Sequence, residues 1–285
     1  MKISAVSEHR CALGEGPVWD ENKQRLYWLD CLGPTLYWLD FRNNRVRHCE
    51  LPGDTVGSLA VRERGGLVLA MDQGFYGFDP EFGRAEPIAL PLNGHDGLRF
   101  NDGKVDPFGH FVSGAMNIQP DGSEIGSMYR LTPEHEVVEL LDGFYCFNGP
   151  CFTEDGSHLY FTGRTGGLIE KFEYGPAQTP VNGETLIDCN ADGATVDADG
   201  YIWSAQWDEG CILRVSPDGE ADTRIEIPGQ VVTSVMFGGP DLDLIYVTTL
   251  GKAFYGAVPR AESPGRTFVI EGSGYQGRAE PTFTG

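Results

Sequence analysis

The chain has 285 residues, of which 40% are hydrophobic and 22% are charged, a composition typical of a globular protein with a core and not of a disordered chain. It carries 42 acidic against 21 basic residues, for a net charge of −21. This charge argues against sequence-independent binding to nucleic acid or to an anionic membrane, because both need basic patches.

The first residues, MKISAVSEHRCALGEG, contain no apolar run of about 7–15 residues, so we expect no signal peptide. No stretch approaches the ~18 apolar residues of a membrane span. The seven cysteines are odd in number, irregularly spaced and without a C-x-x-C pair, which favours reduced thiols over a disulfide framework or a cysteine-rich zinc site. We therefore expect a cytoplasmic protein.

Short runs rich in Tyr, Trp, Phe, Val and Ile follow one another along the chain and stop at Gly, Asp, Asn or Pro. Their apolar–polar alternation predicts β-strands, and no convincing amphipathic helix of about 12 residues interrupts them. The predicted strands lie at residues 25–30, 35–40, 66–72, 110–116, 127–132, 158–163, 168–174, 201–207, 211–216 and 244–250.

Six segments of this all-β chain begin alike, and each reads as strand, polar turn, strand, turn, strand and a fourth run. They start at Gly16, Gly57, Asp102, Gly149, Gly193 and Thr233, so successive starts differ by 41, 45, 47, 44 and 40 residues. A four-stranded unit repeated every ~40–50 residues is typical of a propeller blade, whereas an all-β sandwich would not repeat whole units. We predict a single six-bladed β-propeller domain over residues 1–285.

Four of the repeats carry an oxygen-bearing side chain at one register position. The residues that open the first turn of these repeats are Asp20, Asp106, Thr153 and Asp197. The residues five positions earlier are Glu15, Asn101, Asn148 and Asp192. Innermost strands line the channel of a propeller, so these side chains should converge at its mouth, where a cation would relieve the repulsion between the carboxylates. All-oxygen donors suit Ca²⁺, Mg²⁺ or Mn²⁺, and the alternative is that the four residues merely cap turns.

Five motifs resemble the SMP-30/gluconolactonase family, which includes regucalcin and bacterial sugar lactonases. They are GEGPVW at 14–19, RFNDGKVDPFGHFVSGAM at 99–116, NGPCFTEDG at 148–156, DGATVDADGYIW at 192–203 and FGGPDLDLIYVTT at 237–249. The resemblance implies a six-bladed propeller that hydrolyses aldonolactones with one divalent metal ion at the channel mouth, be it Ca, Zn, Mg, Mn or Fe. It implies Glu15, Asn148 and Asp192 as metal ligands, Asp192 also as the base, and Arg99 and Asn101 as contacts to a small-molecule sugar lactone.

Some residues depart from the family pattern. Gly163-Arg164 stands where an Asp is common, and residues 117–119, Asn-Ile-Gln, replace an acidic stretch. The resemblance leaves open which sugar is the substrate and whether the chain is a monomer or a small homo-oligomer. Asp102 is either a turn residue or a support for the site, and Trp207 with the following loop could rim the mouth. The alternatives are a metal-dependent hydrolase of a non-sugar lactone or organophosphate, or a calcium-binding propeller without turnover.

Overall fold

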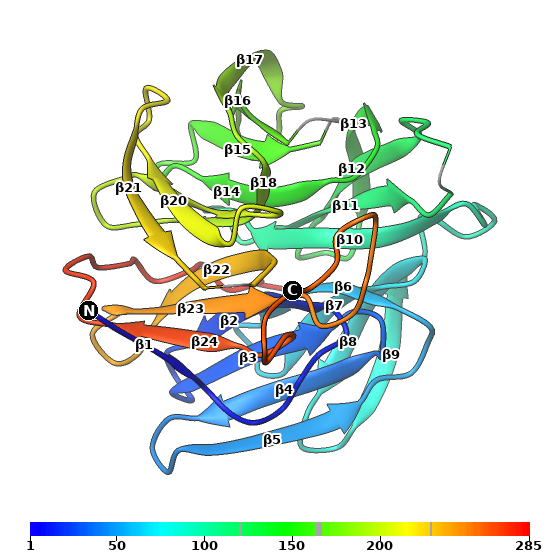
Figure 1. The fold of residues 1–285 in the computed structure, drawn as a ribbon. Helices are drawn as coiled ribbons and strands as arrows, with labels where there is room; N and C mark the ends of the chain where they lie inside the picture. Colours follow the sequence, from blue (N-terminus) through cyan, green and yellow to red (C-terminus); the bar gives the residue numbers. More distant parts are fainter. Residues whose placement is uncertain (120, 164–166, 229) are drawn as a thin grey trace. The chain divides into compact units, whose positions relative to one another are not determined.

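A computed structural model describes residues 1–119, 121–163, 167–228 and 230–285. Among these residues, 24 strands form six four-stranded antiparallel sheets, each a blade (Figure 1). The first three blades run from β2 to β13: Gly14–Asp20, Arg25–Asp30, Thr35–Asp40, Arg45–Glu50; Val56–Val61, Leu67–Met71, Gly74–Asp79, Arg84–Ala89; Leu98–Val105, Phe111–Asn117, Gly126–Leu131, Val137–Phe144. The next two run from β14 to β21: Asn148–Phe152, His158–Thr162, Leu168–Glu173, Val181–Asp188; Ala191–Val196, Ile202–Gln206, Cys211–Val215, Ala221–Glu226. The sixth comprises β22 (Val232–Gly238), β23 (Leu244–Thr249), β24 (Phe268–Glu271) and β1 (Lys2–Ala5). These blades confirm the predicted six-bladed β-propeller.

In two blades, the aspartate that opens the first turn also closes the turn through hydrogen bonds to its own carboxylate. Oδ1 of Asp106 accepts hydrogen bonds from the backbone N–H groups of Phe108 and His110, both at 2.9 Å. Oδ1 of Asp197 accepts from Asp199 and Tyr201 at 3.0 and 2.9 Å. Asp favours turns for this reason, and the repeated device gives the first strands a common register.

The chain forms two compact units. One contains residues 1–50 and 190–279, and the other contains residues 51–189 and 280–285. In the first unit, β22 packs against both β2 and β18; in the second, β10 packs against both β6 and β14. Each unit thus holds three consecutive first strands side by side.

Aromatic side chains fill the core of both units. In the second unit, Phe75 lies 4.6 Å from Phe100 and 5.8 Å from Phe111 between ring centroids, and all three rings are fully buried. In the first unit, Trp203 contacts Phe237 edge-on at 5.7 Å. Tilted and edge-on ring pairs add to the stabilisation from burial, so the blades are held by side-chain packing as well as by their ladders.

The outer strand of the sixth blade comes from the start of the chain, which differs from the expectation that each blade is one contiguous repeat. The pairing of β1 with β24 runs from Lys2↔Glu271 to Ala5↔Phe268, and Figure 1 shows these two strands side by side in blue and red. The short run at residues 2–5 lies outside the repeat, which is why the repeat itself does not reveal its partner.

Within the described residues, no helix has the length and apolar character that crossing a bilayer requires. The seven cysteines are free thiols in the structure.

Candidate functional site

The predicted site residues lie beside irregularities that recur in the first strand of every blade. The pairing register shifts after Glu15, Val56, Phe100, Asn148, Ala191 and Val232. Two of these residues precede glycines in the left-handed region, Gly16 with φ 53° and Gly149 with φ 58°. A bulge of this kind re-aims a side chain and is common beside functional sites.

In the second unit, the structure brings Arg99, Asn101 and Asn148 into one hydrogen-bonded group. Nδ2 of Asn101 donates to Oδ1 of Asn148 at 2.5 Å and to the carbonyl of Phe147 at 2.9 Å. Nη1 of Arg99 donates to Oδ1 of Asn101 at 3.2 Å. Three residues from two adjacent first strands therefore form a continuous polar surface.

Arg99 is buried, with 6% of its surface exposed. Nη1 donates to the carbonyl of Phe100 at 2.8 Å, but Nη2 is buried without a hydrogen-bond partner among the residues that the structure describes. Leaving a buried donor unpaired costs about 1–3 kcal/mol, so this nitrogen is suited to bind an oxygen atom of a ligand.

Asp102 supports this group by hydrogen bonds to backbone N–H groups on both strands, so it is more than a turn residue. Its Oδ2 accepts from the backbone N–H of Gly149 at 2.8 Å and its Oδ1 from that of Gly103 at 2.7 Å. Burial raises the pKa of the Asp102 carboxyl, while these N–H groups and Lys104 act in the opposite direction. The carboxylate ties β10 to the residue that follows Asn148.

Glu15 and Asp192 belong to the first unit, where each is the second residue of its strand, β2 and β18, the strands on either side of β22. Glu15 is half-buried and accepts from the backbone N–H of Gly16 at 3.1 Å, whereas Asp192 is 5% exposed. Buried Asp30 accepts from the N–H groups of Ala12 and Leu13 at 2.7 and 3.1 Å, which fixes the chain just before Glu15.

Thr233, in the irregular part of β22, contacts the residue before Glu15, and the repeat pattern did not predict it. Its hydroxyl donates to the carbonyl of Gly14 at 2.5 Å and lies 2.9 Å from that of Thr248. The five-residue step ended near Val232, which directly precedes Thr233. A search for a polar residue within one position of the step would have found it.

At the register position of the site residues, the second blade has Gly57. No larger side chain fits there, because β6 lies very close to β10. A Cβ atom added to Gly57 would lie 2.3 Å from the carbonyl oxygen of Asn101 and 2.6 Å from that of Phe100. Glycine at this position allows β6 to pack against the strand that bears Arg99 and Asn101.

The residues that depart from the family pattern differ in their burial and contacts. Asn117 is fully buried and holds the segment that follows it, since its Nδ2 donates to Oδ1 of Asp121 and to the carbonyl of Ser123, both at 2.9 Å. Ile118, by contrast, is 42% exposed. Arg164 lies outside the described residues.

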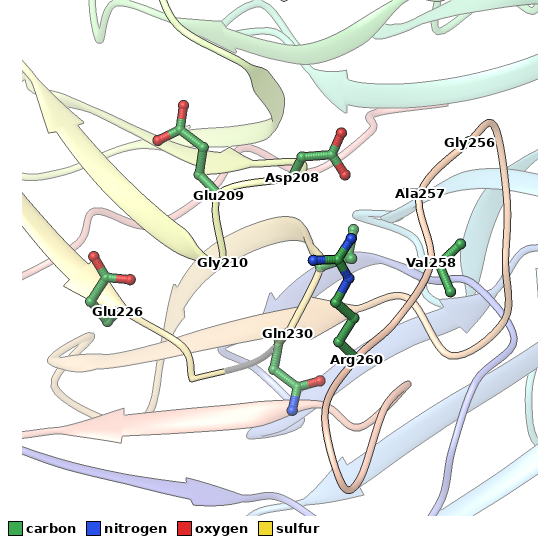
Figure 2. A pocket seen from close by; sticks show the side chains of 10 residues that line it. Asp208, Glu209, Gly210, Glu226, Gln230, Gly256, Ala257, Val258 and Arg260 are labelled. Carbon is green, nitrogen blue, oxygen red and sulfur yellow. The ribbon is translucent and has the colours of Figure 1, made fainter.

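A pocket of about 500 Å³ opens in the first unit (Figure 2). Figure 2 shows the carboxylates of Asp208 and Glu209 on the turn after β19, with the guanidinium of Arg260 on the loop after β23. The backbone N–H of Trp207, which begins the same turn, donates to the carbonyl of Asn190 at 2.9 Å, so this turn lies at the end of the blade that carries Asp192. The loop after Trp207 therefore lines a pocket at the end of the blade that carries Asp192.

The predicted ligand set fits a hard divalent cation by its chemistry. Glu15 and Asp192 offer carboxylate oxygens and Asn148 an amide oxygen, which are the donors that Ca²⁺, Mg²⁺ and Mn²⁺ prefer. Across the described ranges, no cluster of three or more His, Cys, Asp or Glu side chains could hold a metal ion. The predicted set contains only two residues of these four types, Glu15 and Asp192, and its third donor is the amide oxygen of Asn148.

The fold defines the class of protein, a six-bladed β-propeller, and comparison with known proteins defines the family. Residues 13–251 match the family described as SMP-30/Gluconolactonase/LRE-like region, and the chain belongs to this family. Its resemblance to that family, carried by the five motifs, is thus confirmed.

Curated relatives of the chain include lactonases. The chain is 33% identical over 257 residues to the pentonolactonase XacC of Haloferax volcanii, covering 88% of this chain and 86% of the relative. It is 33% identical over 291 residues to the 6-deoxy-6-sulfogluconolactonase of Pseudomonas putida, covering 99% of each chain. Among solved structures, a calcium-binding regucalcin from Agrobacterium tumefaciens aligns with a TM-score of 0.88 and 29% identity over 98% of this chain and 96% of that one.

Proposed function

We propose that the chain hydrolyses a sugar lactone to the corresponding aldonic acid. The observation that carries this proposal is the hydrogen-bonded group of Arg99, Asn101 and Asn148, in which a buried guanidinium nitrogen has no protein partner among the described residues. Directional donors and acceptors of this kind recognise hydroxyl and ester oxygens. The lactonase relatives, with 33% identity over most of both chains, support the same reaction.

In this proposal Glu15, Asn148 and Asp192 hold one divalent metal ion, with Ca, Zn, Mg, Mn and Fe as the candidates. Such an ion, when bound, polarises a carbonyl and lowers the pKa of a bound water. The matching positions of Glu15 and Asp192 on β2 and β18 support the assignment, as does the exclusively oxygen-based donor set.

The residues of the chain would divide the remaining work. Arg99 and Asn101 would bind oxygens of the lactone and fix the orientation of the ring. Asp192 would accept a proton from the water as the water oxygen forms a bond with the carbonyl carbon. The ring C–O bond then breaks, and its oxygen takes up a proton to become a hydroxyl, which leaves the open-chain acid.

The test is acid release from a panel of galactono-, glucono-, arabinono-, xylono- and rhamnonolactone, measured in a pH-stat. The protein is first treated with a chelator and is then assayed with Ca²⁺, Mg²⁺, Mn²⁺, Zn²⁺ or Fe²⁺ added back. Hydrolysis well above the spontaneous rate that returns with a metal supports the proposal and ranks the sugars. No acceleration on any lactone with any metal contradicts it.

A second candidate function is cation binding without turnover, which the calcium-binding relative favours. A chain that binds Ca²⁺ in calorimetry yet hydrolyses no lactone would support it. Turnover of a non-sugar lactone or an organophosphate, with the sugar lactones inert, would instead favour a related hydrolase.

A further inference from the structure

Cys146 lies beside the proposed site without belonging to any motif. It stands between β13 and β14, is half-buried, and pairs through an isolated β-bridge with Met116, which in turn pairs with Arg99 across β10 and β11. Its position two residues before Asn148 therefore brings a thiol to the strands that carry the polar group.

The sulfur of Cys146 contacts the side-chain amides of both asparagines. Nδ2 of Asn148 lies 3.5 Å from Sγ and donates to it; Nδ2 of Asn101 lies 3.3 Å from Sγ and shares its two hydrogens among the sulfur, Oδ1 of Asn148 and the carbonyl of Phe147. The thiol hydrogen is directed to the buried sulfur of Met116 at 3.9 Å. With its own hydrogen turned away, the sulfur presents lone pairs to the two amides.

We propose that Cys146 is a positioning residue that fixes which end of the Asn148 amide faces the site. An asparagine side chain rotated by half a turn exchanges its oxygen for an NH₂ group, and an NH₂ group cannot bind a cation. Because the sulfur holds the NH₂ group of Asn148, Oδ1 of that residue, which accepts from Nδ2 of Asn101, keeps its second lone pair for a cation, while Oδ1 of Asn101 accepts from Arg99. This inference rests on the proposed function, in which Asn148 is a metal ligand.

The experiment compares Cys146→Ala, which removes the acceptor, with Cys146→Ser, which replaces it by a hydroxyl. Cys189→Ala is the matched control, a half-buried thiol of the same unit. Mn²⁺ affinity is measured by calorimetry, and kcat and KM are measured on the best lactone. Thermal melting of each variant shows whether it is folded.

We expect Cys146→Ala to weaken Mn²⁺ binding about tenfold and to lower kcat/KM by a similar factor, since loss of a residue that orients a ligand costs about 10–100-fold. We expect Cys146→Ser to recover most of both losses and Cys189→Ala to match the wild type. A residue that only fills space would give equal results for alanine and serine. Equal results for the two variants, or wild-type Mn²⁺ affinity in Cys146→Ala, would overturn the inference.

The two proposals fail in different ways. If the wild type binds Mn²⁺ but hydrolyses no lactone, the proposed reaction is wrong, and the calorimetry alone decides the role of Cys146. If the wild type hydrolyses lactones and Cys146→Ala keeps full Mn²⁺ affinity, only the role of Cys146 is wrong. If the wild type binds no divalent ion, both are wrong.

Discussion

Asp192 has two roles in the proposed reaction, metal ligand and base, so its substitution should be the most severe in the chain. We expect Asp192→Asn to lower kcat by about 10²–10⁴-fold, the usual contribution of a general base, and to weaken metal binding. The measurements are lactone hydrolysis and calorimetry with Mn²⁺. Asp188→Asn, which neutralises an exposed carboxylate four residues earlier, is the control and should leave both unchanged. Near wild-type activity in Asp192→Asn would remove this residue from the mechanism.

Asp155 shows how a single turn contributes to stability against acid. Its Oδ1 accepts from the N–H of Ser157 at 3.0 Å and from the hydroxyls of Ser157 and Thr153, both at 2.7 Å. These bonds, with that from the Ser157 N–H the largest contributor, lower the pKa of the Asp155 carboxyl to about 2. An unfolded Asp titrates near ~3.9, so the stabilisation is complete above that value and is lost as the pH falls toward 2.

Asp155→Asn should therefore be less stable than the wild type above about pH 5, with the difference shrinking as the pH falls toward 2. Urea unfolding at several pH values measures this difference. Glu154→Gln removes the same charge from the same turn without removing these hydrogen bonds, and it should not reproduce the pH-dependent difference. A difference that grows toward pH 2 would contradict the assignment.

At the scale of strands, Gly57 tests whether close packing of β6 against β10 shapes the polar group. Alanine there would place its Cβ 2.3 Å from the carbonyl oxygen of Asn101, so the strands have to move apart. We expect Gly57→Ala to lower the unfolding free energy by about 1–3 kcal/mol, the usual cost of overpacking, and to raise KM for the lactone.

Gly97→Ala is the control for Gly57→Ala, because the added Cβ would meet only the end of the Ile125 side chain, at 3.9 Å. It should leave both the unfolding free energy and KM near the wild-type values. Equal effects of the two substitutions would show that the spacing of β6 and β10 is not what matters.

The six repeats could be predicted from the sequence because the information is local. Asp106 and Asp197 close their turns within four residues, so a fixed step back from the turn finds Asn101 and Asp192. Cys146 could not be found this way, since its contact with Asn101 joins residues 45 positions apart and follows no repeat. The joint role of Glu15, Asn148 and Asp192 as ligands stays a prediction, as does the single domain.

At the scale of the whole molecule, the sixth blade depends on its N-terminal strand. Deleting residues 1–5 leaves β24 without its outer partner, and an unpaired strand edge invites pairing with another chain. We expect this variant to unfold at a lower temperature and to self-associate as its concentration rises, measured by thermal melting and light scattering.

Lys2→Ala is the matched control for that deletion. It removes only the exposed Lys2–Glu271 ion pair, which is worth at most about 1 kcal/mol, and should stay close to the wild type in both measurements. A deletion variant that behaves like Lys2→Ala would show that β1 is dispensable for the blade.

The pairing of β1 with β24 also has a consequence for biosynthesis. Lys2 is made before its partner Glu271, which follows 269 positions later. At roughly 5–20 residues per second, the ribosome needs on the order of 13–54 s to deliver that partner. For this whole interval the N-terminal strand waits unpaired while the blades between are completed. Residues 2–5 therefore need a sequence that stays out of other sheets until the last blade is made, and an exposed lysine such as Lys2 disfavours pairing along a strand edge.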